Sequence, residues 1–147
     1  MKFGWFSLSG ALLVCLMLVP NVIYGAKHRH WVNKPERRGM NLLEQIGRYG
    51  AMLLMVVPLG TSTGELGFSS NASFVLWMGL CAALLAGYFV CWLLYAQRPT
   101  RHKALMLAIL PSLLFVVRGV SLRHWLLCVF GVVFGVGHLY LTHRSNP

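Results

Sequence analysis

The chain has 147 residues, of which 57% are hydrophobic and only 11% are charged, whereas an ordinary soluble domain carries about 25% charged residues. Thirteen lysines and arginines against three acids give a formal net charge of +10. These charges lie in short stretches between long apolar runs, a distribution that indicates membrane topology. Nucleic-acid binding would need a basic face with interleaved aromatic residues, and we expect no nucleic-acid partner. The composition argues against an ordinary water-soluble domain and predicts a membrane-embedded chain.

The first apolar run, residues 3–25, has no charged residue from Phe3 to Tyr24. At 1.5 Å per residue, a helix of this length extends about 33 Å, which is enough to cross a hydrocarbon core of about 30 Å. The run could also be a signal peptide, because Met1-Lys2 precedes it. Residues 27–38 carry five basic side chains, and such a segment resists export. We therefore expect an uncleaved helix.

Four further apolar segments each predict a helix, at residues 41–60, 72–97, 104–120 and 121–142. The last two are separated by almost no polar sequence, so they predict a helical hairpin. The whole chain, residues 1–147, is then one domain. The fold class that the sequence predicts is all-α, a polytopic transmembrane bundle of five helices.

The basic residues also predict how the chain is oriented. If the five segments alternate across the membrane, ten lysines and arginines fall on one side, and Lys2, Arg118 and Arg123 fall on the other. Basic loops stay in the cytoplasm. The N-terminus is therefore expected outside and the C-terminus in the cytoplasm. We expect a multi-pass protein of the inner (plasma) membrane with membrane lipids as partners.

The two arginines that break this charge rule are candidate ligand-binding residues. Arg118 and Arg123 flank an expected turn, and a guanidinium can hold a phosphate or carboxylate with two parallel hydrogen bonds. A ligand site at this end would be anionic and would include His124. Two alternatives stay open: contact with lipid phosphates, and pairing with Glu65, the one acid assigned to this side.

A second group of candidate ligand-binding residues begins the 41–60 segment. Glu44 and Arg48 lie four residues apart with the acid first, so they can pair on one helix face, and Asn41 extends this polar stripe. An ionisable residue at membrane depth is a functional candidate by default. The alternative is a short interfacial turn whose charges reach water before the span begins at Tyr49.

The last segment carries glycines that favour close helix packing. Gly131 and Gly135 form a small-xxx-small motif, and Gly137 follows. The motif indicates either a contact within the bundle or a seam between copies of the chain. His138 comes next, and a lone intramembrane histidine either relays protons, binds a cofactor or, more commonly, hydrogen-bonds a neighbour. The histidines and cysteines lack metal-ligand spacing, so we predict no metal, cofactor or catalytic residue.

Two stretches carry a resemblance to known proteins: Leu43-Glu44-Gln45-Ile46-Gly47-Arg48-Tyr49-Gly50 and Phe134-Gly135-Val136-Gly137-His138-Leu139-Tyr140. In them the chain resembles uncharacterised small multi-pass integral membrane proteins of bacteria. The resemblance extends over most of the length, with the spans in the same order. It implies a protein of the bacterial inner membrane and adds no catalytic residue, because the group has no assigned activity.

The sequence favours a function in binding or transport of an anionic or lipidic ligand. The alternative is an accessory or interaction protein, of an assembly or immunity type, that acts as a homo-oligomer or with a membrane protein partner. A membrane enzyme comes third, because three acids and scattered histidines offer few groups for acid-base catalysis.

Overall fold

The computed structural model describes residues 2–3, 6–27, 38–57 and 71–145. These residues form five helices: α1 (Leu8–Lys27), α2 (Arg38–Val56), α3 (Asn71–Gln97), α4 (Arg101–Ser121) and α5 (Trp125–Ser145). Two very short strands, β1 (Lys2–Phe3) and β2 (Phe6–Ser7), pair antiparallel ahead of α1. The predicted all-α class with five helices is confirmed in this part of the chain.

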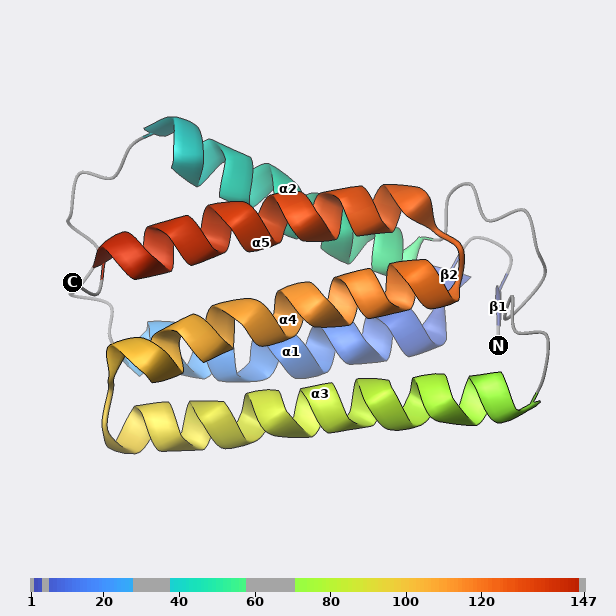
Figure 1. Cartoon of the computed structure of the whole chain (residues 1–147), viewed down its shortest axis with the longest axis horizontal. Helices are drawn as coiled ribbons and strands as arrows, with labels where there is room; N and C mark the ends of the chain where they lie inside the picture. The colour runs from blue at the N-terminus through green and yellow to red at the C-terminus, as the bar shows by residue number, and fades with distance from the viewer. Residues whose placement is uncertain (1, 4–5, 28–37, 58–70, 146–147) are drawn as a thin grey trace.

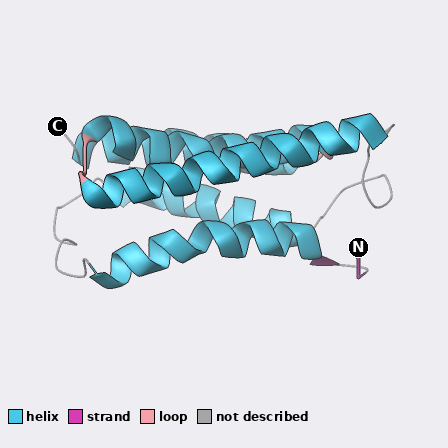
Figure 2. Ribbon diagram, turned by 90° about the horizontal axis from the view of Figure 1, so that it is seen from below, coloured by secondary structure: helices cyan, strands magenta, loops and turns pink. Residues whose placement is uncertain are grey.

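The helices run alternately up and down and form two layers. In one layer α4 lies between α3 and α5, and in the other α1 lies beside α2 (Figures 1 and 2). Most of the contact between the layers joins α2 to α5 (Figure 1). Helix α1 packs more sparsely against α2 and α3, so it is the least tightly held of the five.

One end of the bundle is strongly basic. Helices α1, α3 and α5 finish there and α2 and α4 begin there, at the left of Figure 1. We call it the basic end, and it carries Lys27, Arg38, Arg98, Arg101, Lys103 and Arg144. Arg118 and Arg123 lie at the opposite end. The sequence predicted ten lysines and arginines on one side of the membrane. The fold brings those of the ten that are described toward one end, and the other three, Arg29, Lys34 and Arg37, lie outside the described residues.

Four helices, α1, α3, α4 and α5, are long and apolar enough to cross a membrane by length and composition. Their outward side chains are apolar as well: Leu76 of α3 is 74% exposed and Trp125 of α5 is 70% exposed. A bundle dissolved in water would place polar residues there. These four helices suggest a membrane-embedded protein. Helix α2 is not among them, since its first half carries Arg38, Glu44 and Arg48.

The expected helix boundaries are shifted in α1, α2 and α4. The first helix begins at Leu8 rather than residue 3, because Ser7 acts as its N-cap and accepts a hydrogen bond from the Gly10 N–H at 3.3 Å. Helix α2 runs from Arg38 to Val56 instead of residues 41–60, and α4 already begins at Arg101.

A tight turn makes the predicted start of the last helix wrong. The N–H of Arg123 donates to the carbonyl of Val120 at 3.1 Å, and the N–H of His124 donates to that of Gly119 at 2.7 Å. These are the two hydrogen bonds of a Schellman motif, which ends a helix. Arg123 takes the position with a positive φ of 52°, where glycine is usual. Helix α5 therefore begins at Trp125, not at residue 121.

Glycines let α2 and α5 approach each other closely. A Cβ atom on Gly47 of α2 would lie 2.5 Å from the backbone nitrogen of Phe134 and 2.7 Å from its Cα. A Cβ atom on Gly137 of α5 would lie 3.0 Å from the Cα of Glu44. A side chain at Gly47 would overlap the backbone of Phe134, and one at Gly137 would need Glu44 to move by a few tenths of an ångström, so these glycines set the spacing of the two helices and with it the place of Glu44.

The other two glycines predicted from sequence face α4. A Cβ atom on Gly131 would lie 2.9 Å from the Cβ of Phe115, and one on Gly135 would lie 3.1 Å from the Cβ of Ser112. The glycine motif of α5 thus makes contacts within the bundle, the first of the two interpretations that its sequence left open.

Candidate functional site

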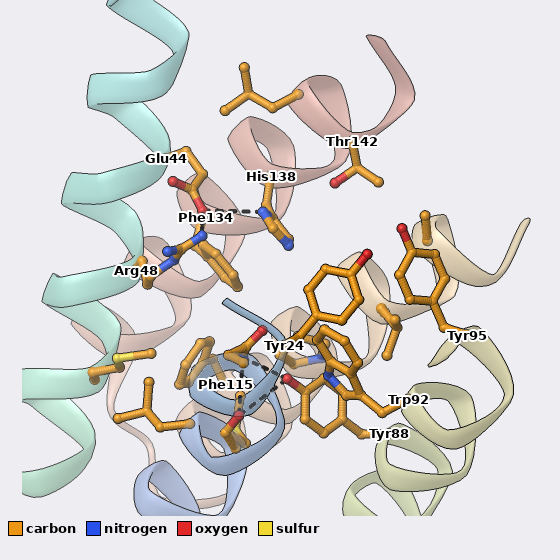
Figure 3. Close-up of a pocket in the computed structure, with 18 of the residues that line it drawn as sticks. Tyr24, Glu44, Arg48, Tyr88, Trp92, Tyr95, Phe115, Phe134, His138 and Thr142 are labelled. Carbon is orange, nitrogen blue, oxygen red and sulfur yellow. Dashed lines mark hydrogen bonds and ion pairs between the residues drawn. The ribbon is translucent and has the colours of Figure 1, made fainter. Parts of the chain in front are cut away.

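A cavity of about 500 Å³ lies between the two helix layers, and all five helices line it (Figure 3). The lining includes Tyr24 from the end of α1, Asn41 from the start of α2 and Thr142 from the end of α5. The cavity therefore occupies the half of the bundle nearer the basic end. Its volume falls within the range of about 300–1,000 Å³ typical of small-molecule sites.

One wall of the cavity carries an ionic cluster. Glu44 and Arg48 of α2 form an ion pair, and Oε1 of Glu44 also lies 3.1 Å from Nδ1 of His138 on α5. The carboxylate is enclosed, with 4% of its side chain exposed, whereas the side chains of Arg48 and His138 are 36% and 29% exposed. The more accessible groups of this cluster are therefore the two basic ones.

Phe134 of α5 supports both basic side chains. The His138 ring stacks on it with centroids 5.0 Å apart and an interplanar angle of 17°, and the guanidinium carbon of Arg48 lies 5.8 Å from its centroid. Phe134 is itself packed edge-on against Phe115 at 5.7 Å. A cation over an aromatic face is favourable, so this ring holds Arg48 and His138 in place.

The opposite wall is aromatic. Tyr24 of α1 lies against Trp92 of α3 at 5.0 Å between centroids, and Trp92 contacts Tyr95 at 5.9 Å and Tyr88 at 6.5 Å. Figure 3 shows these rings across the cavity from Glu44, Arg48 and His138. Rings in tilted and edge-on contact stabilise one another beyond the area they bury, which makes this wall rigid.

Toward the middle of the bundle the lining becomes apolar. Met17, Met52, Leu107, Pro111 and Phe115 line this part. Phe115 is fully buried and Leu107 is 8% exposed. The cavity is thus amphipathic, with ionic and hydroxyl groups toward the basic end and hydrocarbon deeper inside.

A hydrogen-bonded link joins α1 to α3 beside the aromatic wall. The Asn21 amide donates to the Tyr88 hydroxyl at 2.7 Å and to the Met17 carbonyl at 3.1 Å, and the Tyr88 hydroxyl donates to that same carbonyl at 3.2 Å. These groups satisfy one another in a setting with little water. The link fastens the sparsely packed helix α1 over the cavity.

Replacing Tyr88 with phenylalanine is expected to lower the free energy of unfolding by about 1 kcal/mol, because the hydroxyl both donates and accepts a hydrogen bond between two helices. Hydrogen exchange of the backbone amides should speed up in α1 more than in α5. The control is Tyr49→Phe, since Tyr49 is 65% exposed on α2. Equal losses of stability in the two variants would show that the link does not hold α1.

The three residues expected to form an anionic site at the other end are not brought together. Arg118 is buried and faces α1 and α3. Arg123 is exposed and closes the α4–α5 turn. His124 is buried, and its Nδ1 accepts the N–H of Leu127 at 3.0 Å, so it caps the start of α5. Glu65, the predicted partner of the arginines, lies outside the described residues.

The second predicted group does come together at the cavity. Asn41, Glu44 and Arg48 all line it. Helix α2 is continuous from Arg38, and Glu44 is buried within the bundle rather than open to water. His138, considered alone in the sequence, hydrogen-bonds a neighbour as the commoner interpretation had it.

Sequence reasoning missed the aromatic wall. Tyr88, Trp92 and Tyr95 follow at spacings of four and three residues, which place them on one face of α3. That spacing was the available signal. Within the described residues, no group of three histidine, cysteine or acidic side chains is arranged to hold a metal ion.

The described part of the chain is thus a five-helix bundle that has four long apolar helices and encloses an amphipathic cavity. Comparisons with protein-family models, with curated proteins and with solved structures found no match for the chain.

Proposed function

We propose that this chain is a multi-pass membrane protein that binds an anionic amphiphile in its cavity. A hydrocarbon tail would lie against the apolar part near Leu107 and Phe115. A carboxylate or phosphate head would lie at Arg48 and His138. The observation that carries the proposal is the uneven exposure of the ionic cluster on the cavity wall: the Glu44 side chain is 4% exposed, whereas those of Arg48 and His138 are 36% and 29% exposed.

The charge around the cavity supports an anionic head. Glu44 is the one acid among the described residues, and its charge is matched by that of Arg48. The basic end contributes six more cations near the cavity, and a field of one sign concentrates ligands of the opposite charge. An anion that reaches the cavity therefore meets an excess of positive charge.

We propose binding rather than transport for the cavity. Among the described residues, Leu54, Met55, Leu114 and Leu127 pack the bundle beyond it and are 6%, 1%, 2% and 1% exposed. The accessory role was predicted from the glycines of α5, as a surface for another protein, and from the lack of a catalytic constellation. Those glycines contact α2 and α4 instead, so the glycine motif does not support that role.

The proposed setting is the bacterial inner membrane, with five crossings, the N-terminus outside and the basic end in the cytoplasm. The alternating helices and the collection of basic residues at one end support this orientation. Helix α2 is compatible with a crossing because Glu44 faces the bundle interior and is paired there, as ionisable groups in membranes usually are.

The proposal is tested by thermal unfolding of the protein in an uncharged detergent. Oleate and lysophosphatidate should raise the unfolding temperature, and monoolein, which has the same tail without a charge, should do so much less. Arg48→Gln should weaken the apparent affinity for oleate by about tenfold, the effect of losing one charged hydrogen bond.

The matched control is Arg123→Gln, which removes the same charge from an exposed position at the opposite end. It should leave oleate binding unchanged. The proposal fails if monoolein stabilises the protein as strongly as oleate, or if the two arginine variants lose affinity equally.

A further inference from the structure

A second arginine is buried at the end opposite the basic end. Arg118 of α4 is 2% exposed, and its guanidinium carbon lies 5.5 Å from the ring centroid of Trp77 on α3. Its Nη2 donates to the hydroxyls of Ser7 and Ser9 at 3.0 and 3.1 Å. Its Nη1 is buried and has no hydrogen-bond partner among the described residues. A buried guanidinium that keeps its charge needs compensation, because desolvation of an unpaired ion is costly.

This guanidinium lies at the N-terminus of α1. Ser7 is the N-cap, and a Cβ atom on Gly10 would lie 3.2 Å from Nη2 of Arg118. The first-turn N–H groups of a helix lack intrahelical partners and carry partial positive charge. Two positive features therefore lie side by side, and an anion between them would be stabilised by both.

The polar side chains around Arg118 also offer more hydrogen-bond donors than acceptors. The hydroxyls of Ser7 and Ser9 lie 3.3 Å apart, so one hydrogen can bridge them while the other stays available. Both oxygens already accept from Arg118. The described acid, Glu44, belongs to the cavity near the basic end. Ser9 is exposed, which leaves a path for a ligand.

We propose that the N-terminus of α1 and Arg118 together bind one phosphate group. Ser7 and Ser9 hold the guanidinium against the helix terminus, and the free Nη1, a serine hydroxyl and the first-turn N–H groups other than that of Gly10 donate to the phosphate oxygens. A helix N-terminus with a charged donor is a natural phosphate site. The phosphate comes either from free inorganic phosphate or from a lipid headgroup. The site is separate from the cavity and does not depend on its function.

The test measures the unfolding temperature in an uncharged detergent as inorganic phosphate replaces chloride at constant ionic strength. A parallel titration uses glycerophosphoglycerol, the water-soluble headgroup of phosphatidylglycerol. Phosphate should stabilise the wild-type protein, Arg123→Gln and Arg48→Gln alike. Arg118→Met should abolish the response. Ser7→Ala with Ser9→Ala should weaken apparent affinity by about tenfold, whereas Ser121→Ala should not.

The serine variants keep the test decisive if Arg118→Met does not fold. A response to inorganic phosphate alone identifies the free ion, and a stronger response to the headgroup identifies lipid; both support the site. The proposal is overturned if phosphate has no effect on the wild type, or if it acts equally on the serine double variant and Ser121→Ala. It is also overturned if a response appears only in Glu65→Gln, since the chain's own carboxylate then occupies the site.

Discussion

Replacing Gly47 with alanine is expected to destabilise the protein by about 1–3 kcal/mol, the usual cost of overpacking a tight core. The new methyl group would lie 2.5 and 2.7 Å from backbone atoms of Phe134. A backbone cannot rotate away as a side chain can, so α2 and α5 must separate. Alanine favours a helix over glycine by about 1 kcal/mol, and the clash outweighs this gain. Unfolding by titration with a denaturing detergent measures the change.

The matched control is Gly39→Ala on the same helix. A Cβ atom on Gly39 has no atom within 4 Å among those described, so this substitution should leave stability unchanged or raise it slightly. If both variants shift stability in the same direction by similar amounts, the α2–α5 spacing is not set by Gly47.

Replacing Glu44 with alanine should have two opposite effects. Stability should fall by about 1–3 kcal/mol, because Arg48 and His138 lose the charged acceptor that they share. Affinity for an anionic amphiphile should rise, because the two basic groups are no longer neutralised. Detergent-induced unfolding and an oleate titration measure the two effects on one sample.

Two further variants complete this comparison. Gln45→Ala changes an exposed residue beside Glu44 and should stay within about 0.5 kcal/mol of the wild type. The double variant Glu44→Ala/Arg48→Ala should be less destabilised than the sum of its single changes, since the paired groups leave together. Additive losses, or a loss of oleate affinity in Glu44→Ala, would contradict the assigned cluster.

The features that local rules govern were predictable from the sequence. Apolar length predicted the helices to within a few residues at most ends, and the four-residue spacing of Glu44 and Arg48 predicted their pairing, because both residues belong to one helix. The glycines of α5 predicted close packing in the same way. In each of these cases the geometry of a single helix is sufficient for the prediction.

The features that depend on how helices face one another were not predictable. His138 meets Glu44 from another helix, and the rotation that brings them together is set by Gly47 and Gly137 acting together. Arg118 was expected beside Arg123, but it turns inward to Ser7 and Ser9 while Arg123 serves the turn. The sequence shows which helix faces are polar, whereas the relative rotation of the helices determines which of these faces contact one another.

Helix α1 is held by partners that come much later in the chain. Its N-cap Ser7 and its first-turn Ser9 meet Arg118 across 111 and 109 residues, and Asn21 meets Tyr88 across 67. These polar side chains can therefore be satisfied only in a bundle that contains α3 and α4. The side of the cavity that α1 covers is thus completed by contacts between segments that lie far apart in the sequence.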